Sequence, residues 1–460
     1  GGKDSMSGSF LDLDLPPTLI SFAIAPILAG EVITPEFKEA GHPVYQFAFA
    51  DDSAESRKAA WEAFHALCQA GKVKAAWAAE NGLADAVMKM SFGNRVGFRT
   101  DDDPVNWFGI GSAVIVAELT EDVDSPYAKC IGVTTAEEAI TIGNDSAKID
   151  ELLSLNEAVL ENVYPTRTVE TAEAPCLAAA SGPAKAPVLA KTKIAKPRVV
   201  IPVFPGTNCE YDSARACVRA GLEAETVVIR NLTAEALRQS ALELEEAIRR
   251  GQIVFLPGGF SGGDEPDGSA KFIVSFFRSP RITDAVHDLL QNRDGLMLGI
   301  CNGFQALIKL GLVPYGKIVD TTDSDPTLTY NAIGRHQSSI VRTAVCSTLS
   351  PWLMEAEQGG IYSVPISHGE GRFVASREVL ERLREAGQIA TQYVDLTGAP
   401  SMDTAFNPNG SAWAIEGITS PDGRVLGKMG HSERTGPGLY RNVPGQYDMG
   451  LFRSAARYFR

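Results

Sequence analysis

The stretch that decides the fold of the second half of the chain is Leu298-Gly299-Ile300-Cys301-Asn302-Gly303-Phe304-Gln305-Ala306-Leu307. The apolar residues 295–300 predict a short buried strand, and apolar residues at helical spacing follow Cys301. Cys301 is therefore expected at a strand-to-helix turn, between Gly299 and Gly303. Such a turn presents the thiol at the edge of a sheet, where the helix N-terminus favours the thiolate. The pattern favours a nucleophile over a buried cysteine that packs as a small apolar side chain, the commoner role of a lone cysteine.

A strand–helix alternation surrounds this turn. Strands are expected at residues 198–204, 225–230 and 252–257, and helices at 208–221 and 233–250. The alternation predicts an α/β fold with a mostly parallel, flavodoxin-like sheet covered by helices. In such folds the active site lies beyond the carboxyl ends of the strands. Asn208, Gly258, Gly259 and Cys301 all fall at such ends.

Two further segments precede this α/β domain, which we assign to residues 198–460. Residues 1–163 predict an α+β domain, with helices at 56–70, 81–90 and 146–160 and strands at 17–25 and 44–50. Residues 164–197 are rich in Pro and Ala and have no periodicity. That composition predicts a semi-extended, solvent-exposed linker.

Composition excludes several classes of function. The formal net charge of the 460 residues is −15, which argues against nucleic acid as a partner, since phosphate binding needs a basic surface. The seven cysteines include no CxxC pair, which favours a reducing compartment over a disulfide framework or a zinc site. Neither a membrane-length apolar run nor a signal peptide is present, so we expect no membrane partner and a cytoplasmic location.

A thiolate that attacks an amide needs a base and a group that orients this base. Among the six histidines, His431 is followed two residues later by Glu433, whose carboxylate is suited to fix the imidazole tautomer. The alternative for such a pair is a surface ion pair. His368, between Ser367 and Gly369, is the rival base. The glycines beside His368, Gly369 and Gly371, suggest close backbone approach to a ligand, and we assign this histidine to the pocket.

The same chemistry needs N–H donors for the oxyanion. Gly258-Gly259 follows the strand that precedes the cysteine strand, and Asn302 offers its own N–H beside the nucleophile. At the other end of the chain, residues 1–8 predict a glycine-rich turn whose N–H groups, with Lys3, are able to cradle phosphates. The alternative there is a plain loop or a frayed terminus.

Residues 198–460 resemble a class I (triad) glutamine amidotransferase domain, most closely that of the phosphoribosylformylglycinamidine synthase family of purine biosynthesis. The motifs that carry the resemblance are Phe204-Pro205-Gly206-Thr207-Asn208-Cys209-Glu210, Pro257-Gly258-Gly259-Phe260-Ser261, Gly299-Ile300-Cys301-Asn302-Gly303-Phe304-Gln305, Ser367-His368-Gly369-Glu370-Gly371-Arg372-Phe373 and His431-Ser432-Glu433-Arg434.

The resemblance implies a nucleophile, Cys301, that attacks the side-chain amide of glutamine while His431, oriented by Glu433, moves protons. It implies further that ammonia leaves and that water releases glutamate from the thioester. The residues that it implies for binding glutamine and the oxyanion are Gly258, Gly259, Asn302, Gln305, His368 and Gly369.

The first part of the chain is similar to the synthetase region of the same family, in residues 1–7 and in residues 81–94. The resemblance implies a C-terminal portion of a large single-chain enzyme, with ATP and Mg²⁺ as cofactors of the full enzyme and phosphoribosylformylglycinamide as its second substrate. The nucleotide-binding candidates here are Lys3, Asp4 and Ser5. The family's acidic turn is reduced to Glu80, so the metal ligands stay unknown.

Two alternatives remain open. A γ-glutamyl hydrolase or a peptidase-like relative also places a cysteine and a histidine on this fold, and would cleave γ-glutamyl peptides. A non-catalytic scaffold with a structural cysteine would leave Cys301 unreactive towards a glutamine-mimicking alkylator.

Overall fold

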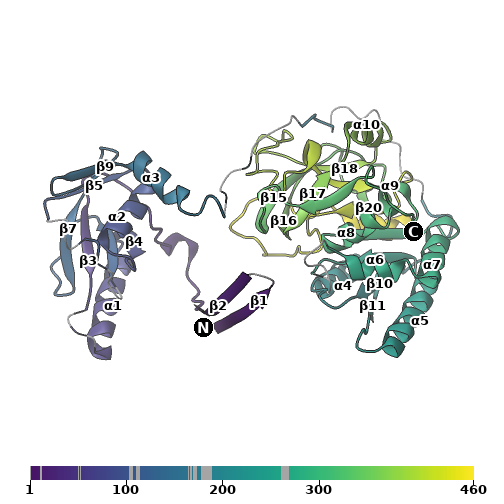
Figure 1. The fold of residues 1–460 in the computed structure, drawn as a ribbon, viewed down its shortest axis with the longest axis horizontal. Helices are drawn as coiled ribbons and strands as arrows, with labels where there is room; N and C mark the ends of the chain where they lie inside the picture. Colours follow the sequence, from purple (N-terminus) through teal and green to yellow (C-terminus); the bar gives the residue numbers. More distant parts are fainter. Residues whose placement is uncertain are drawn as a thin grey trace. The chain divides into compact units, whose positions relative to one another are not determined.

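The computed structural model shows two compact units, Gly1–Asn162 and Val163–Arg460 (Figure 1). It describes residues 2–10, 13–49, 51, 53–102, 107–109, 114–163, 165, 168, 174–177, 189–260 and 269–460. Each unit has its own sheet and its own buried apolar core. Among the described residues, every helix is too short or too polar to cross a membrane.

A nine-stranded sheet forms the centre of the second unit, in the order β11-β10-β12-β13-β20-β19-β18-β15-β16. Its strands are β10 (Arg198–Val203), β11 (Glu223–Val228), β12 (Ile253–Leu256), β13 (Leu296–Ile300), β15 (Gln337–Val345), β16 (Ile361–His368), β18 (Ile389–Tyr393), β19 (Ile415–Thr419) and β20 (Val425–Lys428). From β11 to β20, neighbouring strands are parallel. All residues of β12 and β13 are buried, as in strands covered on both faces. The predicted α/β fold with a parallel sheet is confirmed.

The helices of this unit begin where the sequence offers N-terminal signals. Thr233 caps the helix after β11 by accepting the N–H of Ala236 at 3.1 Å, and Pro280 lies in the first turn of another. The helices are α4 (Glu210–Arg219), α5 (Ala234–Arg250), α6 (Lys271–Phe277), α7 (Pro280–Gln291), α8 (Asn302–Lys309), α9 (Leu312–Tyr315), α10 (Arg377–Glu385) and α11 (Leu451–Tyr458). Because α8 begins two residues after β13 ends, Cys301 alone makes the turn between them.

The other half of the sheet is antiparallel, which the strand–helix alternation did not predict. Strands β19, β18, β15 and β16 run antiparallel to their neighbours, and β14 (Thr327–Tyr330) pairs with β17 (Glu370–Val374) in a separate small sheet. Strand β20 joins the two halves, because it is parallel to β13 and antiparallel to β19. The loop after Lys428 therefore begins beside the end of the cysteine strand. Short 3-10 turns occur at Pro351–Leu353 and Ala412–Ala414.

A seven-stranded sheet forms the centre of the first unit, in the order β4-β6-β3-β7-β5-β8-β9. Its strands are β3 (Pro43–Phe47), β4 (Val73–Ala78), β5 (Gly97–Thr100), β6 (Ile115–Leu119), β7 (Ala128–Thr135), β8 (Ala139–Ile142) and β9 (Asp145–Lys148). The helices are α1 (Ala54–Gln69), α2 (Leu83–Phe92) and α3 (Ile149–Ala158), with a 3-10 turn at Ala29–Glu31. The three predicted helices occur, and their ends differ by a few residues.

The N-terminal residues form a strand, so the predicted glycine-rich turn is wrong. Strand β1 (Gly2–Phe10) pairs antiparallel with β2 (Leu13–Phe22), which places Lys3, Asp4 and Ser5 opposite Ser21, Ile20 and Leu19. Glycine and serine tolerate extended backbone, and the apolar run of β2 supplies a partner strand. The side chains of these three candidates lie outside the described residues, so their role towards a nucleotide stays a prediction.

Parts of the Pro/Ala-rich segment pack against the second unit, so the prediction of an exposed linker is wrong for them. Leu177 is buried, and its N–H donates to Oε1 of Gln392 at 3.1 Å. The N–H of Ala190 donates to the carbonyl of Tyr458 at 3.1 Å. Because alanine and leucine are apolar, segments of this composition gain stability wherever a neighbouring surface lets them bury.

Candidate active site

Cys301 occupies a strained turn at the carboxyl end of β13. Its φ of 53° and ψ of −108° lie in a region that non-glycine residues rarely adopt. Two hydrogen bonds hold the turn: the Cys301 N–H donates to the Lys428 carbonyl at 2.9 Å, and the Gln305 N–H donates to the Cys301 carbonyl at 3.0 Å. The Sγ of Cys301 lies 3.7 Å from the carbonyl oxygen of Ser367 in β16.

The two glycines around Cys301 are required by close backbone packing. A Cβ on Gly299 would lie 2.6 Å from the carbonyl oxygen of Gly303, and a Cβ on Gly303 would overlap the carbonyl of Leu256. Any side chain at either position would push α8 away from β12 and β13. The glycine spacing that predicted the turn therefore has a steric cause.

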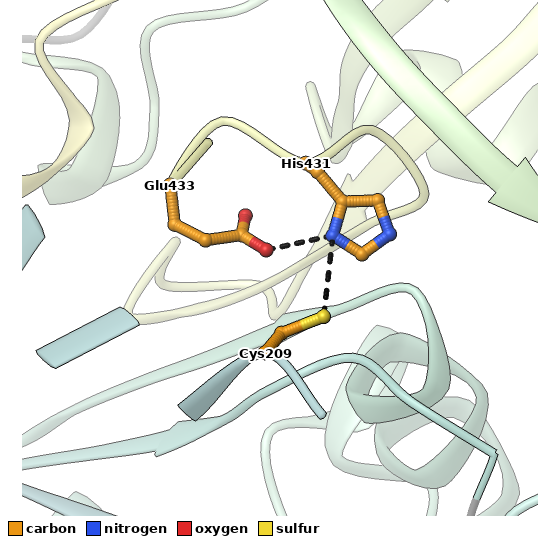
Figure 2. A group of neighbouring side chains, drawn as sticks. All are labelled: Cys209, His431 and Glu433. Carbon is orange, nitrogen blue, oxygen red and sulfur yellow. Dashed lines mark hydrogen bonds and ion pairs between the residues drawn. The ribbon is translucent and has the colours of Figure 1, made fainter. Parts of the chain in front are cut away.

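His431 and Glu433 form a buried pair on the loop after β20 (Figure 2). Nδ1 of His431 lies 2.6 Å from Oε1 of Glu433, and the two side chains are 2% and 0% exposed. Burial lowers the pKa of His431, but the charge of Glu433 and hydrogen bonds to the thiols of Cys209 and Cys301 outweigh it, so this pKa lies well above its usual value. The alternative of a surface ion pair is excluded by this burial.

Gly258 brings the imidazole and the thiols together. A Cβ built on Gly258 would lie 2.6 Å from Cε1 of His431, 3.1 Å from Sγ of Cys209 and 3.4 Å from Cβ of Cys301. Three groups from three segments thus meet above one glycine that follows β12. Glycine is needed there because the three side chains already fill the space of a Cβ.

Gly259 has a φ of 146°, a backbone conformation that residues with a side chain rarely adopt, and a Cβ there would lie 2.5 Å from the carbonyl oxygen of Gly206. The neighbouring hydrogen bonds run from Phe260 N–H to Gly206 and from Asn208 N–H to Gly258. Among the described backbone hydrogen bonds, the N–H of Gly259 has no acceptor. An N–H group without an acceptor is able to donate a hydrogen bond to an oxyanion.

His368 lies at the end of β16, one residue after the carbonyl that faces the Cys301 thiol. Its Nδ1 lies 3.1 Å from Oδ1 of Asn331, and its Nε2 has no partner among the described residues. Burial, with the charges of His431 and His336, lowers its pKa to about 3. Because of this low pKa, folded His368 is neutral and a much weaker base than His431.

The glycines around His368 differ from what we expected. A Cβ on Gly371 would lie 2.5 Å from the His368 ring, whereas a Cβ on Gly369 would meet nothing within 4 Å. Gly371 therefore makes room for the histidine itself and not for a ligand. Gln305 lies nearby, with its Nε2 donating to the Glu370 carbonyl at 2.5 Å and its Oε1 accepting from Asn302 Nδ2 at 2.9 Å.

Sequence analysis did not identify three residues of the candidate site, Lys428, Glu416 and Cys209. Lys428 and Glu416 form a buried ion pair of 3.0 Å, with exposures of 1% and 0%. Lys428 also donates to the Gly430 carbonyl and to Ser432 Oγ, both at 3.0 Å, while Glu416 accepts the Gly430 N–H at 2.6 Å. The pair fixes the loop that carries His431. Cys209 stood inside a quoted motif, but nothing in the motif indicated that it lies beside His431.

At the carboxyl edge of the parallel sheet, a thiol, an imidazole and a carboxylate lie next to one another. This arrangement is typical of α/β proteins suited to thiol-dependent chemistry. The family model described as CobB/CobQ-like glutamine amidotransferase domain matches residues 196–459. The chain belongs to this family.

Curated relatives match the same half. The subunit PurQ of phosphoribosylformylglycinamidine synthase from Treponema denticola is 35% identical over 251 residues, 52% of this chain and 88% of the relative. The Thermus thermophilus PurQ is 33% identical over 256 residues, 55% of this chain and 97% of the relative. A solved structure titled "Structure of PurLQS from Thermotoga maritima" is 26% identical, covers 58% of this chain and 100% of that chain, and has a TM-score of 0.42.

Proposed function

We propose that the second unit hydrolyses glutamine to glutamate and ammonia, and that the ammonia serves phosphoribosylformylglycinamidine synthesis. The observation that carries the proposal is the buried His431–Glu433 pair, 2.6 Å apart, with Cys301 at the end of β13 beside His431 across Gly258. Membership of a glutamine amidotransferase family supports glutamine as the substrate. The names of the PurQ relatives support the destination of the ammonia.

In the proposed mechanism, Cys301 transfers its proton to the ring nitrogen of His431 that does not face Glu433. The raised pKa of His431 favours this charge-separated state. The thiolate sulfur then forms a bond to the amide carbon of glutamine, and the oxyanion is bound by the N–H groups of Gly259 and Asn302. Glu433 stabilises the imidazolium throughout.

The second half of the mechanism restores the thiol. His431 gives its proton to the amide nitrogen, the carbon–nitrogen bond breaks, and ammonia leaves a thioester on Cys301. A water molecule, deprotonated by His431, attacks the thioester carbon. The carbon–sulfur bond then breaks to release glutamate, and His431 returns the proton to the sulfur of Cys301. The balance is glutamine plus water to glutamate plus ammonia.

The proposal extends to the first unit as the tail of an ATP-using synthetase in a large single-chain enzyme. In such an enzyme ATP activates the formyl amide oxygen of phosphoribosylformylglycinamide, and ammonia displaces it. Within the described part of the first unit, no three His, Cys, Asp or Glu side chains cluster as metal ligands. The described residues of this unit thus offer no such cluster for Mg²⁺, and we derive no step through ATP or Mg²⁺ here. The seven free cysteines support a cytoplasmic setting.

The test compares glutamine hydrolysis by the full chain with that by Cys301→Ala, and uses Cys217→Ala as the matched buried-thiol control. We expect Cys301→Ala to lose at least about 1,000-fold in rate and to trap no thioester, while Cys217→Ala keeps its activity. Equal rates in the wild type and in Cys301→Ala would overturn the proposal.

The competing cysteine hydrolase and the scaffold are tested in the same preparation. Cleavage of γ-glutamyl peptides faster than release of ammonia from glutamine would favour the hydrolase. Absence of both activities, together with no alkylation of Cys301 by a glutamine-mimicking reagent, would favour the scaffold. If the wild type shows no activity, adding a separate synthetase of the same family in trans distinguishes a glutaminase that depends on its synthetase from a protein without catalytic activity.

A further inference from the structure

The thiol of Cys209 has no role in the mechanism above, yet it lies against the catalytic pair. Cys209 is 1% exposed and immediately precedes α4. Its Sγ lies 3.9 Å from Nδ1 of His431, the same nitrogen that faces Glu433 (Figure 2). Arg434 Nη2 donates to this sulfur at 3.0 Å.

These side chains offer three different metal-binding atoms at one point. Sγ of Cys209, a ring nitrogen of His431 and a carboxylate oxygen of Glu433 all lie within 4.8 Å of one another. The second carboxylate oxygen, Oε2, is buried and has no hydrogen-bond partner among the described residues. A buried oxygen in that state is costly unless a ligand binds it.

We propose that Cys209, His431 and Glu433 bind a zinc-class divalent cation, which inhibits the enzyme. Thiolate sulfur with imidazole nitrogen suits Zn²⁺, whereas Mg²⁺ and Ca²⁺ prefer sites made of oxygen ligands. An imidazole nitrogen and a carboxylate oxygen that bind the same tetrahedral zinc ion lie about 3.3 Å apart. Glu433 therefore moves back slightly from its 2.6 Å contact with His431 when the metal binds.

The proton balance of binding is simple. The thiol of Cys209 loses its proton to solvent as sulfur bonds to the metal. The proton on Nδ1 of His431 also leaves, so that this nitrogen binds the metal. The hydrogen bond between His431 and Glu433 is then broken, and the imidazole can no longer form the cation that the proposed glutaminase needs.

A cobalt titration tests the binding without any activity measurement. Co²⁺ bound by a thiolate gives a near-ultraviolet charge-transfer band, which Zn²⁺ removes by displacing the cobalt. We expect the band in the wild type, in Cys301→Ser and in the exposed-thiol control Cys130→Ser, and its loss in Cys209→Ser. A band that persists in Cys209→Ser, or one lost in Cys301→Ser, would overturn the assignment.

Glu433→Gln supplies a second variant that leaves all thiols in place, in case Cys209→Ser does not fold. We expect it to weaken Co²⁺ binding by at least about tenfold, and unchanged affinity would contradict the carboxylate ligand. The inhibition itself rests on the proposed function. The zinc concentration that halves each protein's own rate should rise at least about tenfold in Cys209→Ser. If the wild type has no glutaminase activity, the proposed function fails, while the cobalt band still decides the metal site.

Discussion

Among the described residues, two histidine–glutamate pairs have a fully buried carboxylate, one in each unit, and only the pair in the second unit lies beside cysteine thiols. Nδ1 of His42 lies 2.6 Å from Oε1 of Glu118 in the first unit, and Nδ1 of His431 lies 2.6 Å from Oε1 of Glu433 in the second. Both carboxylate side chains are 0% exposed. The distance and the burial of the carboxylate are therefore the same in a pair that lies beside thiols and in one that does not.

The surroundings of the two carboxylates make the difference. Glu118 accepts the N–H of Lys38 on one oxygen at 2.6 Å and the N–H of Glu39 on the other at 3.1 Å, so it fastens that segment to β6. Glu433 has one oxygen without a described partner, and its histidine faces two thiols. Both oxygens of Glu118 accept backbone N–H groups, which is typical of a structural carboxylate, whereas Glu433 keeps one oxygen without a described partner beside a thiol.

The largest expected effect comes from removing the charge of each pair in turn. Glu433→Gln should lower kcat/KM for glutamine by about 10²–10⁴-fold, because the imidazolium loses its stabilising carboxylate. Glu118→Gln should leave this value unchanged and lower the unfolding free energy of the first unit by about 1–3 kcal/mol, because a buried donor loses its acceptor. Steady-state kinetics and urea unfolding measure the two effects. Loss of activity in Glu118→Gln, with Glu433→Gln active, would reverse the comparison.

Proximity in sequence explains why only one pair was predicted. His431 and Glu433 are two residues apart, so the pattern is visible without a fold. His42 and Glu118 meet only because β3 pairs with β6. The turn at Cys301 was likewise predicted from local spacing, since Gly299 and Gly303 are fixed by backbone clashes within the same strand–helix unit and its neighbour.

The remaining features depend on contacts that the sequence does not encode locally. Glu416 and Lys428 form a pair across β19 and β20, strands of the antiparallel half that the strand–helix alternation could not reveal. Cys209 follows β10 and His431 follows β20. They come close because the carboxyl ends of these two strands lie at the same edge of the sheet. The strand at Lys3 depends on pairing with β2, while glycine content alone predicted a turn.

The buried pair of Lys428 and Glu416 extends the comparison to a carboxylate whose partner is a lysine. Lys428→Met should destabilise the second unit by about 3–5 kcal/mol, because it leaves Glu416 buried without its cation. It also removes the donors to Gly430 and Ser432, so kcat should fall more than the glutamine KM changes. Thermal unfolding and kinetics at a temperature where the variant is folded measure these effects separately.

The double variant Lys428→Met with Glu416→Leu is the matched control for Lys428→Met. It removes both charges, so stability should recover in part while the loop remains badly positioned and kcat stays low. Full recovery of kcat together with stability would mean that the pair contributes to folding alone and does not position His431.

The smallest expected effect distinguishes the histidines by pH. The pKa of His431 is raised in the folded state, so its pair contributes stability that is complete below the unfolded pKa of 6.5 and is lost as pH rises through the folded pKa. The pKa of His368 is lowered to about 3, so this residue has the opposite effect. The unfolded chain takes up a proton below pH 6.5 that folded His368 refuses, and stability falls as pH falls towards 3.

This difference between the folded and unfolded pKa values of His368 lowers the unfolding free energy by about 2 kcal/mol at about pH 5. His368→Gln keeps a donor for Asn331 but cannot titrate, so its unfolding free energy should lose about 2 kcal/mol less than the wild type between about pH 7 and pH 5. Urea unfolding of both proteins across that range measures the difference. Parallel pH profiles would show that His368 takes up its proton at the same pH in the folded and the unfolded protein. His368 would then be a second cation near Cys301 at about pH 5, and it would compete with His431 for the thiolate.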